Sequence, residues 1–590
     1  MSRKDYSEYS REDLVREIQR LEKQKTYGLV WEEDKTKEIF DLYLNWDGIS
    51  TKEQIPDGDK FPVLKEDESK AIISDKEKAT DILIEGDNYH ALTVLNWTHK
   101  GKIDIIYIDP PYNTGTESFR YNDRIVNKED PYRHSKWLSF MSKRLKLAKK
   151  LLKQDGTIFI SINEEELAQL KLLCDEIFGD DNYLALFSIK VRHEDRILKG
   201  DKDFHEVIEY LLLYRRSRQY KTVKRIYDNT SLSEYTFQIK ELTANPQKIK
   251  LGSKIVDVFR IGEFKVTKVE PHLNNLKKIN IRGSIKEGNS SGRFYMAHEE
   301  ELKKYPGCII KVPNIGGDGL GCRYFLLPSS EKKVNADYFQ GVPTDRAQTK
   351  EVPYPNYFDF EEDFNNVGYE GGIDFRNGKK PIRFLQKILH LGGATQKKNA
   401  VVVDFFAGSG TTGHAVLQLN KEDNGNRKFI LCTNNENDIC TEVCYPRIEK
   451  VIKGYTTSKG EIVEGLGGNL RYFKTAFINA EPTDVNRRKM VDESTEMLCI
   501  KENAFEAVEN GKGFKIFKNH EKYLGIIYVE SAVPSFIKSI EKIKEKISVY
   551  IFSYNESVPT DDFQEFKNVT LEPIPESILN VYRRIMNDQN

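Results

Sequence analysis

The chain has 590 residues, enough for three or four domains of ~150 residues each. Its 91 Lys and Arg nearly cancel its 92 Asp and Glu, so contacts with nucleic acid must come from local patches rather than from a basic net charge. No apolar run approaches the ~18 residues of a membrane span, the first residues lack the apolar core of a signal peptide, and seven Cys have no disulfide spacing, which predicts a reduced, cytoplasmic protein.

Residues 1–75 are expected to form an N-terminal helical arm followed by a linker. Leu14, Ile18 and Leu21 recur on one face of a highly charged helix, which is typical of a docking or dimerisation helix. Residues 50–80 are polar and interrupted by proline and glycine, which indicates a linker.

The next segment, 76–229, has the strand and helix alternation of an α/β domain. Residues 81–88 predict a strand that ends in a turn, and residues 90–97 have helical spacing. Residues 103–108 are almost continuously apolar and β-branched, as expected for a strand that is covered on both faces of a parallel sheet.

The strand 103–108 stops at the sequence Asp109-Pro110-Pro111-Tyr112. Neither proline can donate a backbone hydrogen bond, so the chain leaves the sheet as a stiff turn at the carboxyl end of the strand, where open α/β sheets bind ligands. Asp109 and the Pro110 carbonyl could accept both hydrogens of an exocyclic amine while Tyr112 stacks on its base, which must be flipped out of a duplex. The alternative is an ordinary Asp-Pro turn after a core strand.

The residues DPPYNTG after IIYI resemble the catalytic motif of amino-group DNA methyltransferases, in which an Asp at the first position usually goes with adenine. The resemblance implies S-adenosylmethionine as the cofactor and Asp109, Pro110, Pro111 and Tyr112 as the catalytic residues. It also implies an α/β fold with a Rossmann-like sheet.

The rest of this segment predicts a mobile loop over 116–134, helices over 134–154 and 164–178, and strands over 156–163, 184–191 and 206–214. The run 214–225 places six Lys and Arg between aromatic residues. Such a run either contacts DNA phosphates or is an ordinary solvated face, and both interpretations stay open. The expected DNA-binding residues in this run are Arg215, Arg216, Arg218 and Lys221.

Residues 230–374 have a different sequence pattern: short segments of alternating polar and apolar residues, separated by turns rich in Gly and Asn. An insert of this kind between two halves of a sheet is where recognition normally occurs, so this segment is expected to be the target recognition domain.

Residues 375–475 are expected to be the second half of the catalytic domain. A strand, a glycine turn and a helix start follow one another in AVVVDFFAGSGTTG, residues 400–413, and Glu436 follows the next strand. The glycine spacing alone would also fit NAD. DFFAGSGTTG, however, resembles the S-adenosylmethionine loop of the same methyltransferases, which implies a cofactor site formed by Asp404, Phe406, Gly408, Gly410, Thr411, Thr412 and Glu436.

Two more residues are assigned to the cofactor. Lys380 lies in a segment that resembles the Lys-Pro segment covering the methionine end of the cofactor, although Lys379 fits as well. Asp87 could touch the adenine ring, and capping the following helix is the equally good alternative.

Asp109 precedes Asp404 by 295 residues, the order of the beta class of these enzymes, and a doubly wound sheet permits it because the two strands are expected to be neighbours at the switch point. The segments NNENDICTEVCYPRIEKVIKGY and GLGGNLRYFKTAFI and the N-terminal helix resemble the modification subunits of bacterial type III restriction systems. Residues 476–590 are expected to form a small domain for dimerisation or partner contact, or else for packing alone.

The sequence therefore predicts a cytoplasmic, nucleoid-associated adenine-N6 DNA methyltransferase without a metal ion. Its expected partners are double-stranded DNA, a second copy of the chain and a restriction subunit that carries helicase and nuclease activity. Two alternatives stay open: a specificity subunit that acts mainly by binding DNA, and an N4-cytosine methyltransferase, whose target amine has the same geometry.

Overall fold

The computed structural model describes residues 60–587 except 76–77, 115–131, 196–203, 282–289, 330–334, 376–377, 458, 480, 482, 520 and 554–558. The chain divides into two compact units, one formed by residues 1–223 and 355–590 and the other by residues 224–354. The predicted N-terminal helix and most of the loop 116–134 lie outside the described residues. Among the described residues, no helix is both long and apolar enough to span a membrane.

The first unit is built on one large sheet. Its strands are, in spatial order, β1 (Lys60–Glu66), β23 (Asn469–Asn479), β3 (Thr80–Glu85), β20 (Lys428–Thr433), β19 (Val401–Asp404), β4 (Ile103–Ile108), β5 (Leu152–Ile162), β7 (Ile208–Arg215), β6 (Tyr183–Lys190) and β18 (Tyr357–Asp359). A short strand, β2 (Ile72–Ile73), pairs with β23. The strands from β23 to β5 run parallel to one another, whereas β7 is antiparallel to both of its neighbours.

The order of the strands reverses between β19 and β4. β19 leads through α10 (Thr411–Asp423) to β20 on one side, and β4 leads through α4 (Arg133–Leu151) to β5 on the other. Val402 and Val403 pair with Ile105 and Ile106, so the two strands are direct neighbours, as the sequence predicts. The carboxyl ends of β19 and β4 therefore meet at a topological switch point, where ligands bind in such sheets.

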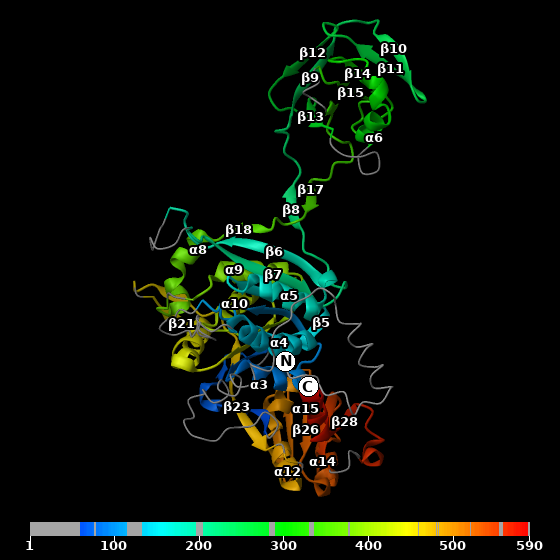
Figure 1. Ribbon diagram of the computed structural model, residues 1–590. Helices are drawn as coiled ribbons and strands as arrows, with labels where there is room; N and C mark the ends of the chain where they lie inside the picture. Colours follow the sequence, from blue (N-terminus) through cyan, green and yellow to red (C-terminus); the bar gives the residue numbers. More distant parts are fainter. Residues whose placement is uncertain are drawn as a thin grey trace, which may run out of the picture. The chain divides into compact units, whose positions relative to one another are not determined.

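Because parallel crossovers are right-handed, the helices that follow β19 and β4 cover opposite faces of the sheet. α3 (Asn88–Thr98), α4 and α5 (Leu167–Phe178) pack side by side on one face, and α9 (Ile382–Leu391), α10 and α11 (Tyr445–Lys453) pack on the other (Figure 1). α4 buries Trp137, Met141 and Leu145, spaced four residues apart, which is the apolar stripe expected from its sequence.

The predicted linker is wrong for residues 60–73. Phe61 to Leu64 are buried in β1, which pairs antiparallel with β23, and Pro62 faces Phe477 in that ladder. β1 is an edge strand, where a proline is tolerated because one side of the strand needs no backbone donor. The proline that suggested a linker is thus compatible with a strand.

Residues 224–354 form the second unit, an entirely antiparallel sheet. Its strands are, in spatial order, β10 (Gln247–Leu251), β11 (Lys254–Phe259), β14 (Ile309–Pro313), β15 (Cys322–Leu326), β16 (Asp337–Gln340), β13 (Leu276–Asn280), β9 (Tyr235–Glu241) and β12 (Phe264–Lys268). Two short helices, α6 (Ser290–Ala297) and α7 (Glu299–Leu302), contribute Tyr295 and Leu302 to its core. A ribbon of β8 (Arg225–Asp228) and β17 (Thr349–Val352) pairs where the chain enters and leaves the unit (Figure 1).

This unit starts and ends earlier than the expected recognition segment 230–374. Residues from Pro355 onward, with β18 and α8 (Glu361–Asn366), belong to the first unit, because β18 extends the large sheet beside β6.

Residues 484–587 add a smaller sheet to the first unit. Its strands are β24 (Glu506–Gly511), β25 (Phe514–Lys518), β26 (Lys522–Ile527), β27 (Lys546–Phe552) and β28 (Val569–Ile574), with helices α12 (Asp484–Asp492), α13 (Thr495–Glu502), α14 (Val533–Ile540) and α15 (Glu576–Asn587). β25 and β26 form a hairpin with its turn at Asn519. The Tyr582 hydroxyl donates to the Pro62 carbonyl at 2.8 Å, so α15 is joined to β1.

Candidate active site

The turn after β4 is held on both sides. The Trp137 indole of α4 donates to the Pro111 carbonyl at 2.8 Å. Asn113 has a left-handed backbone, with φ +60°, and its side-chain amide donates to the buried Glu166 carboxylate at 2.7 Å. Trp137 thereby occupies the Pro111 carbonyl, which leaves the Pro110 carbonyl to serve with Asp109 as the predicted acceptor pair. Asp109 and Tyr112 are therefore fixed at the carboxyl edge of the sheet.

Asp109 and Tyr112 belong to a network of four side chains. The Tyr112 hydroxyl donates to Asp109 Oδ1 at 2.8 Å and lies 3.1 Å from Glu209 Oε2. Lys380 Nζ donates to the Tyr112 hydroxyl at 2.7 Å and to Glu209 Oε2 at 2.9 Å, and it lies 3.2 Å from Asp109 Oδ1. One ammonium and one hydroxyl are thus shared between two carboxylates.

Glu209 is the residue of this network that the sequence reasoning missed. It lies near the start of β7. Because β7 is antiparallel to β5, its start pairs with the carboxyl end of β5. The available signal was a carboxylate inside an apolar strand, since the three residues Leu211 to Leu213 that follow it are buried. A charged residue in such a strand needs a partner, and Lys380 is that partner here.

The network sets the protonation of its members. Burial raises the pKa of Asp109, the Lys380 ammonium lowers it, and the Glu209 charge raises it again, with a net rise. For Glu209, burial is opposed by Lys380, which brings the pKa below its ordinary value. Burial alone would lower the pKa of Lys380, but the two carboxylates raise it above its ordinary value, so the lysine stays charged.

The glycine turn after β19 carries the second group of predicted residues. Asp404 accepts from the Phe406 amide at 3.0 Å and from the Thr412 hydroxyl at 2.5 Å. Gly408 and Gly410 have φ of +50° and +75°, a left-handed backbone that glycine adopts without strain. Gly410 directly precedes α10, so Thr411 and Thr412 occupy its first turn.

Asp404 is almost completely buried, and burial raises its pKa to about 7. Its two hydrogen bonds come from neutral donors, and no Lys or Arg pairs with it among the described residues. A buried carboxylate without a countercharge is costly unless a cation joins it. Asp404 is therefore suited to bind a ligand ammonium.

Arg447 of α11 supports the glycine turn and was not foreseen from the sequence. It is fully buried, donates to the Thr411 hydroxyl at 2.6 Å and to Ser409 Oγ at 3.2 Å, and lies 3.5 Å from Glu370 Oε2. A Cβ on Gly413 would meet Ile448 of the same helix at 2.9 Å. The turn is thus locked against α11.

The other predicted cofactor residues are distributed around these two groups. Asp87 caps α3 by accepting from the Tyr89 amide at 2.7 Å and pairs with Arg144 at 3.0 Å, so its capping role is present. Glu436 is half-buried and opens the segment after β20, the neighbour of β19. Lys380 lies against Asp109, at the end of β4, whereas Lys379 donates to the Glu370 carbonyl at 2.6 Å.

The structure does not bring the predicted DNA-binding residues to the Asp109 edge. Arg215 pairs with Thr157 in the β5–β7 ladder, at the end of the sheet opposite to Asp109. Arg215 donates to the Asp181 carbonyl at 3.1 Å and Arg218 to the Asp181 carboxylate at 3.1 Å, while Arg216 and Lys221 follow the same strand. Their contact with DNA stays a prediction that this placement does not favour.

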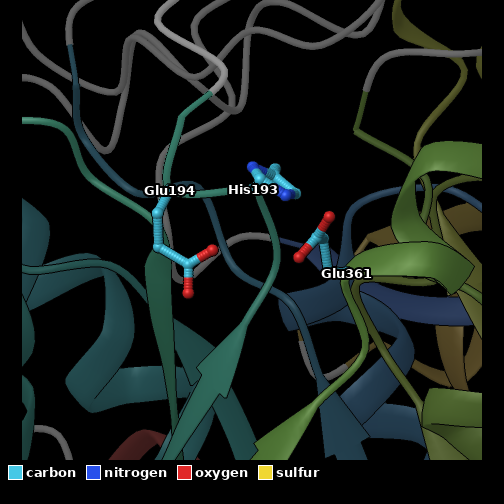
Figure 2. A group of neighbouring side chains, drawn as sticks. All are labelled: His193, Glu194 and Glu361. Atoms are coloured by element: carbon cyan, nitrogen blue, oxygen red, sulfur yellow. The ribbon is translucent and has the colours of Figure 1, made fainter.

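One group of side chains has the composition of a metal site. The ligand atoms of His193, Glu194 and Glu361 lie within 4.8 Å of one another, at the end of β6 and the start of α8 (Figure 2). The Lys190 ammonium, however, pairs with Glu194 at 2.8 Å and with Glu361 at 2.9 Å. Lys190 thus occupies both carboxylates with its ammonium and compensates one of their two negative charges.

The sequence of the chain is similar to those of known proteins. A family model described as a DNA methylase matches residues 103–443, more than half of the chain. The chain is 28% identical over 423 residues to the probable type III restriction-modification enzyme HindVI Mod subunit of Haemophilus influenzae, and these cover 67% of the chain and 54% of the relative.

Two other relatives have a similar identity. The StyLTI Mod subunit of Salmonella typhimurium, also a type III restriction-modification enzyme, is 29% identical over 64% of this chain and 57% of its own length. The type II methyltransferase M.KpnI of Klebsiella pneumoniae is 28% identical over 67% of this chain and 90% of its own length. The chain thus spans little more than half the length of the two Mod subunits.

Proposed function

Since the chain belongs to the DNA methylase family, we propose that it transfers the methyl group of S-adenosylmethionine to the N6 amine of adenine in double-stranded DNA. The observation that carries the proposal is the adjacency of β19 and β4, which brings the Asp404 turn and the Asp109 turn to one switch point. Each turn alone would also fit another role. Together they provide two neighbouring sites, one for a cationic methyl donor and one for the amine that accepts the methyl group.

The residues at the end of β19 fit the methyl donor. Asp404 would hold its ammonium, Gly408 and Gly410 allow the backbone to approach it, and the start of α10 favours its carboxylate. Phe406 and Glu436 would contact its adenosine part. When bound, S-adenosylmethionine supplies a methyl carbon whose bond to the sulfonium sulfur breaks with the electron pair left on sulfur.

The residues at the end of β4 fit the acceptor. Asp109 and the Pro110 carbonyl would accept the two N–H groups of the target amine and free its nitrogen lone pair to point at the methyl carbon. Tyr112 would stack on the flipped base. The nitrogen is neutral before attack and releases one proton afterwards, so Asp109 would have to be ionised to accept first the hydrogen bond and then that proton.

We further propose that the chain is the modification subunit of a type III restriction system and that residues 224–354 read the DNA sequence. Resemblance to the Mod subunits supports the first part. The second rests on the separate compact unit, which is not required for the switch point. A restriction subunit and a second copy of the chain are the partners that this reading implies.

The test is modified-base sequencing of DNA from a methylation-free bacterial host that expresses this chain, with Asp109→Ala as the matched control. We expect N6-methyladenine at one short motif, on one strand, that disappears in the control. If N4-methylcytosine is found instead, the target base is cytosine and the chain is an N4-cytosine methyltransferase. No mark from a folded protein that binds S-adenosylmethionine would refute methyl transfer and leave the DNA-binding subunit as the function.

A further inference from the structure

We propose that Glu209 is a positioning residue that keeps Asp109 available to the target amine by holding the Lys380 ammonium and the Tyr112 hydroxyl. The inference rests on the proposed function and adds to it a residue on β7, outside both motifs.

The geometry shows a competition at Asp109. Its Oδ1 atom already faces the Tyr112 hydroxyl at 2.8 Å and the Lys380 ammonium at 3.2 Å. An arriving amine donates two N–H groups and must take a lone pair of Asp109. Both present donors also reach Glu209 Oε2, at 3.1 Å and 2.9 Å, and Lys380 lies closer to Glu209 than to Asp109. Glu209 is thus an alternative acceptor for both donors when the amine enters.

Charge gives a second reason for this carboxylate. Asp109 and Glu209 together carry two negative charges against the single charge of Lys380. Without Glu209, the ammonium would pair with Asp109 alone, neutralise it, and occupy the oxygen that the amine needs. Charge-assisted hydrogen bonds are the stronger ones, so a neutral amine would compete poorly with an undivided ammonium.

Lys380 also has a role in the proton release that follows methyl transfer. After the amine nitrogen has bonded to carbon through its lone pair, it releases one of its two protons, which Asp109 accepts and passes to water. An ammonium nearby lowers the proton affinity of Asp109 and so helps this release. Glu209 therefore keeps Asp109 free to accept the hydrogen bond of the amine, and Lys380 lowers the proton affinity of Asp109 so that it can pass the proton on.

The pH dependence follows from the groups around Asp109. The charged and titratable groups that face Asp109 or its partner Glu209 are Lys380, Glu209, Tyr112, Tyr107, Asp404 and, through Glu209, Arg192. Removing the Glu209 charge takes away an influence that raises the pKa of Asp109, so the acid limb of the rate should move to lower pH. Removing the Lys380 charge should move it to higher pH.

The experiment is a double-mutant cycle with Glu209→Gln, Lys380→Met and the double variant, with the exposed Glu176→Gln of α5 as the control. Single-turnover methyl transfer is measured on an oligonucleotide that carries the motif found by sequencing, at saturating S-adenosylmethionine and from pH 5.5 to 8.5. Cofactor binding is measured separately by calorimetry, and flipping by the fluorescence of 2-aminopurine at the target position.

We expect Glu209→Gln to slow transfer about 10- to 100-fold, the range for one charged hydrogen bond, with cofactor binding within about twofold of wild type. The double variant should be at least about tenfold faster than Glu209→Gln, because Asp109 is released when Lys380 is also absent. A double variant that is no faster, or an acid limb that does not move in Glu209→Gln, overturns the inference, since a purely structural glutamate predicts both.

A crystal structure of Glu209→Gln gives a readout that does not depend on turnover. Lys380 Nζ should close on Asp109 Oδ1 from 3.2 Å to roughly 2.8 Å, the length of a charged hydrogen bond. An unmoved lysine overturns the inference even if the chain transfers no methyl group. If the wild-type chain marks no DNA but Lys380 closes on Asp109, the proposed function fails and the assignment of Glu209 as the competing acceptor stands.

Discussion

Replacing Asp404 by Asn should stabilise the ligand-free protein while it weakens cofactor binding. Burial raises the pKa of this carboxyl from 3.8 to about 7, so the folded state pays for ionising it above neutral pH. Asn keeps the hydrogen-bonding pattern, because its oxygen can accept from the Phe406 amide and its NH₂ can donate to the Thr412 hydroxyl. Only the buried charge is lost.

The magnitude follows from the difference between the two pKa values. A shift of about three pH units corresponds to roughly 4 kcal/mol at most, at ~1.4 kcal/mol per unit. The folded-state pKa is raised, so the wild-type protein loses stability as the pH rises from 3.8 to about 7 and loses no more above that. The advantage of Asn should therefore grow by about 2 kcal/mol between pH 5.5 and 7 and then level off.

The assay is hydrogen exchange of the β19 and α10 amides, expressed as protection factors, because a chain of several domains does not unfold in one step. Asp104→Asn is the matched control. Asp104 is also buried in the central sheet, but it pairs with Lys153 at 2.7 Å and Lys397 at 3.0 Å, so its loss should reduce protection. Calorimetry should show S-adenosylmethionine binding roughly 10- to 100-fold weaker in Asp404→Asn. Equal protection of wild type and variant at pH 8, or a gain that does not depend on pH, would refute the reasoning.

Asp109→Ala should abolish methyl transfer and leave S-adenosylmethionine binding within about twofold in calorimetry; loss of both would mean that the turn after β4 is misassigned. Gly413→Ala should lower the local stability of α10 by about 1–3 kcal/mol, because the added Cβ would meet Ile448 at 2.9 Å and Leu431 at 3.0 Å, and unchanged hydrogen-exchange protection of α10 would show that α11 can shift. Replacing residues 229–348 by a short loop, which joins the paired ends Asp228 and Thr349, should leave cofactor binding intact and remove sequence-specific marking. A shortened chain that still marks one motif would place recognition elsewhere.

The parts of the site that follow from local sequence were accessible to prediction. The strand 103–108 and the strand before Asp404 are short apolar runs that end in proline or glycine turns, and these signals need no tertiary context. The hairpin at Asn519 is of the same kind. Even the adjacency of β19 and β4 could be inferred, because two ligand-binding turns of one sheet must share its switch point.

The missed residues depend on contacts between distant segments. Glu209 acts through Lys380, 171 residues away, and Arg447 reaches the glycine turn from α11. The polar, proline-containing composition predicts a linker at β1, and local sequence gives no sign of its partner strand, which begins about 400 residues later in the chain. Periodicity reports which face of an element is buried, but it does not report which charged residue that face will meet.

The position of residues 224–354 explains how the chain can hold a large insert without disturbing the site. The chain leaves the large sheet after β7, at the end of the strands opposite to Asp109, and returns in β18, the edge strand beyond β6. Neither β7 nor β18 borders β19, so the insert imposes no constraint on the pairing of β19 with β4. The distance in sequence between Asp109 and Asp404 is therefore free to vary, whereas Glu209, which precedes the insert on β7, and Lys380, which follows it, must meet across it.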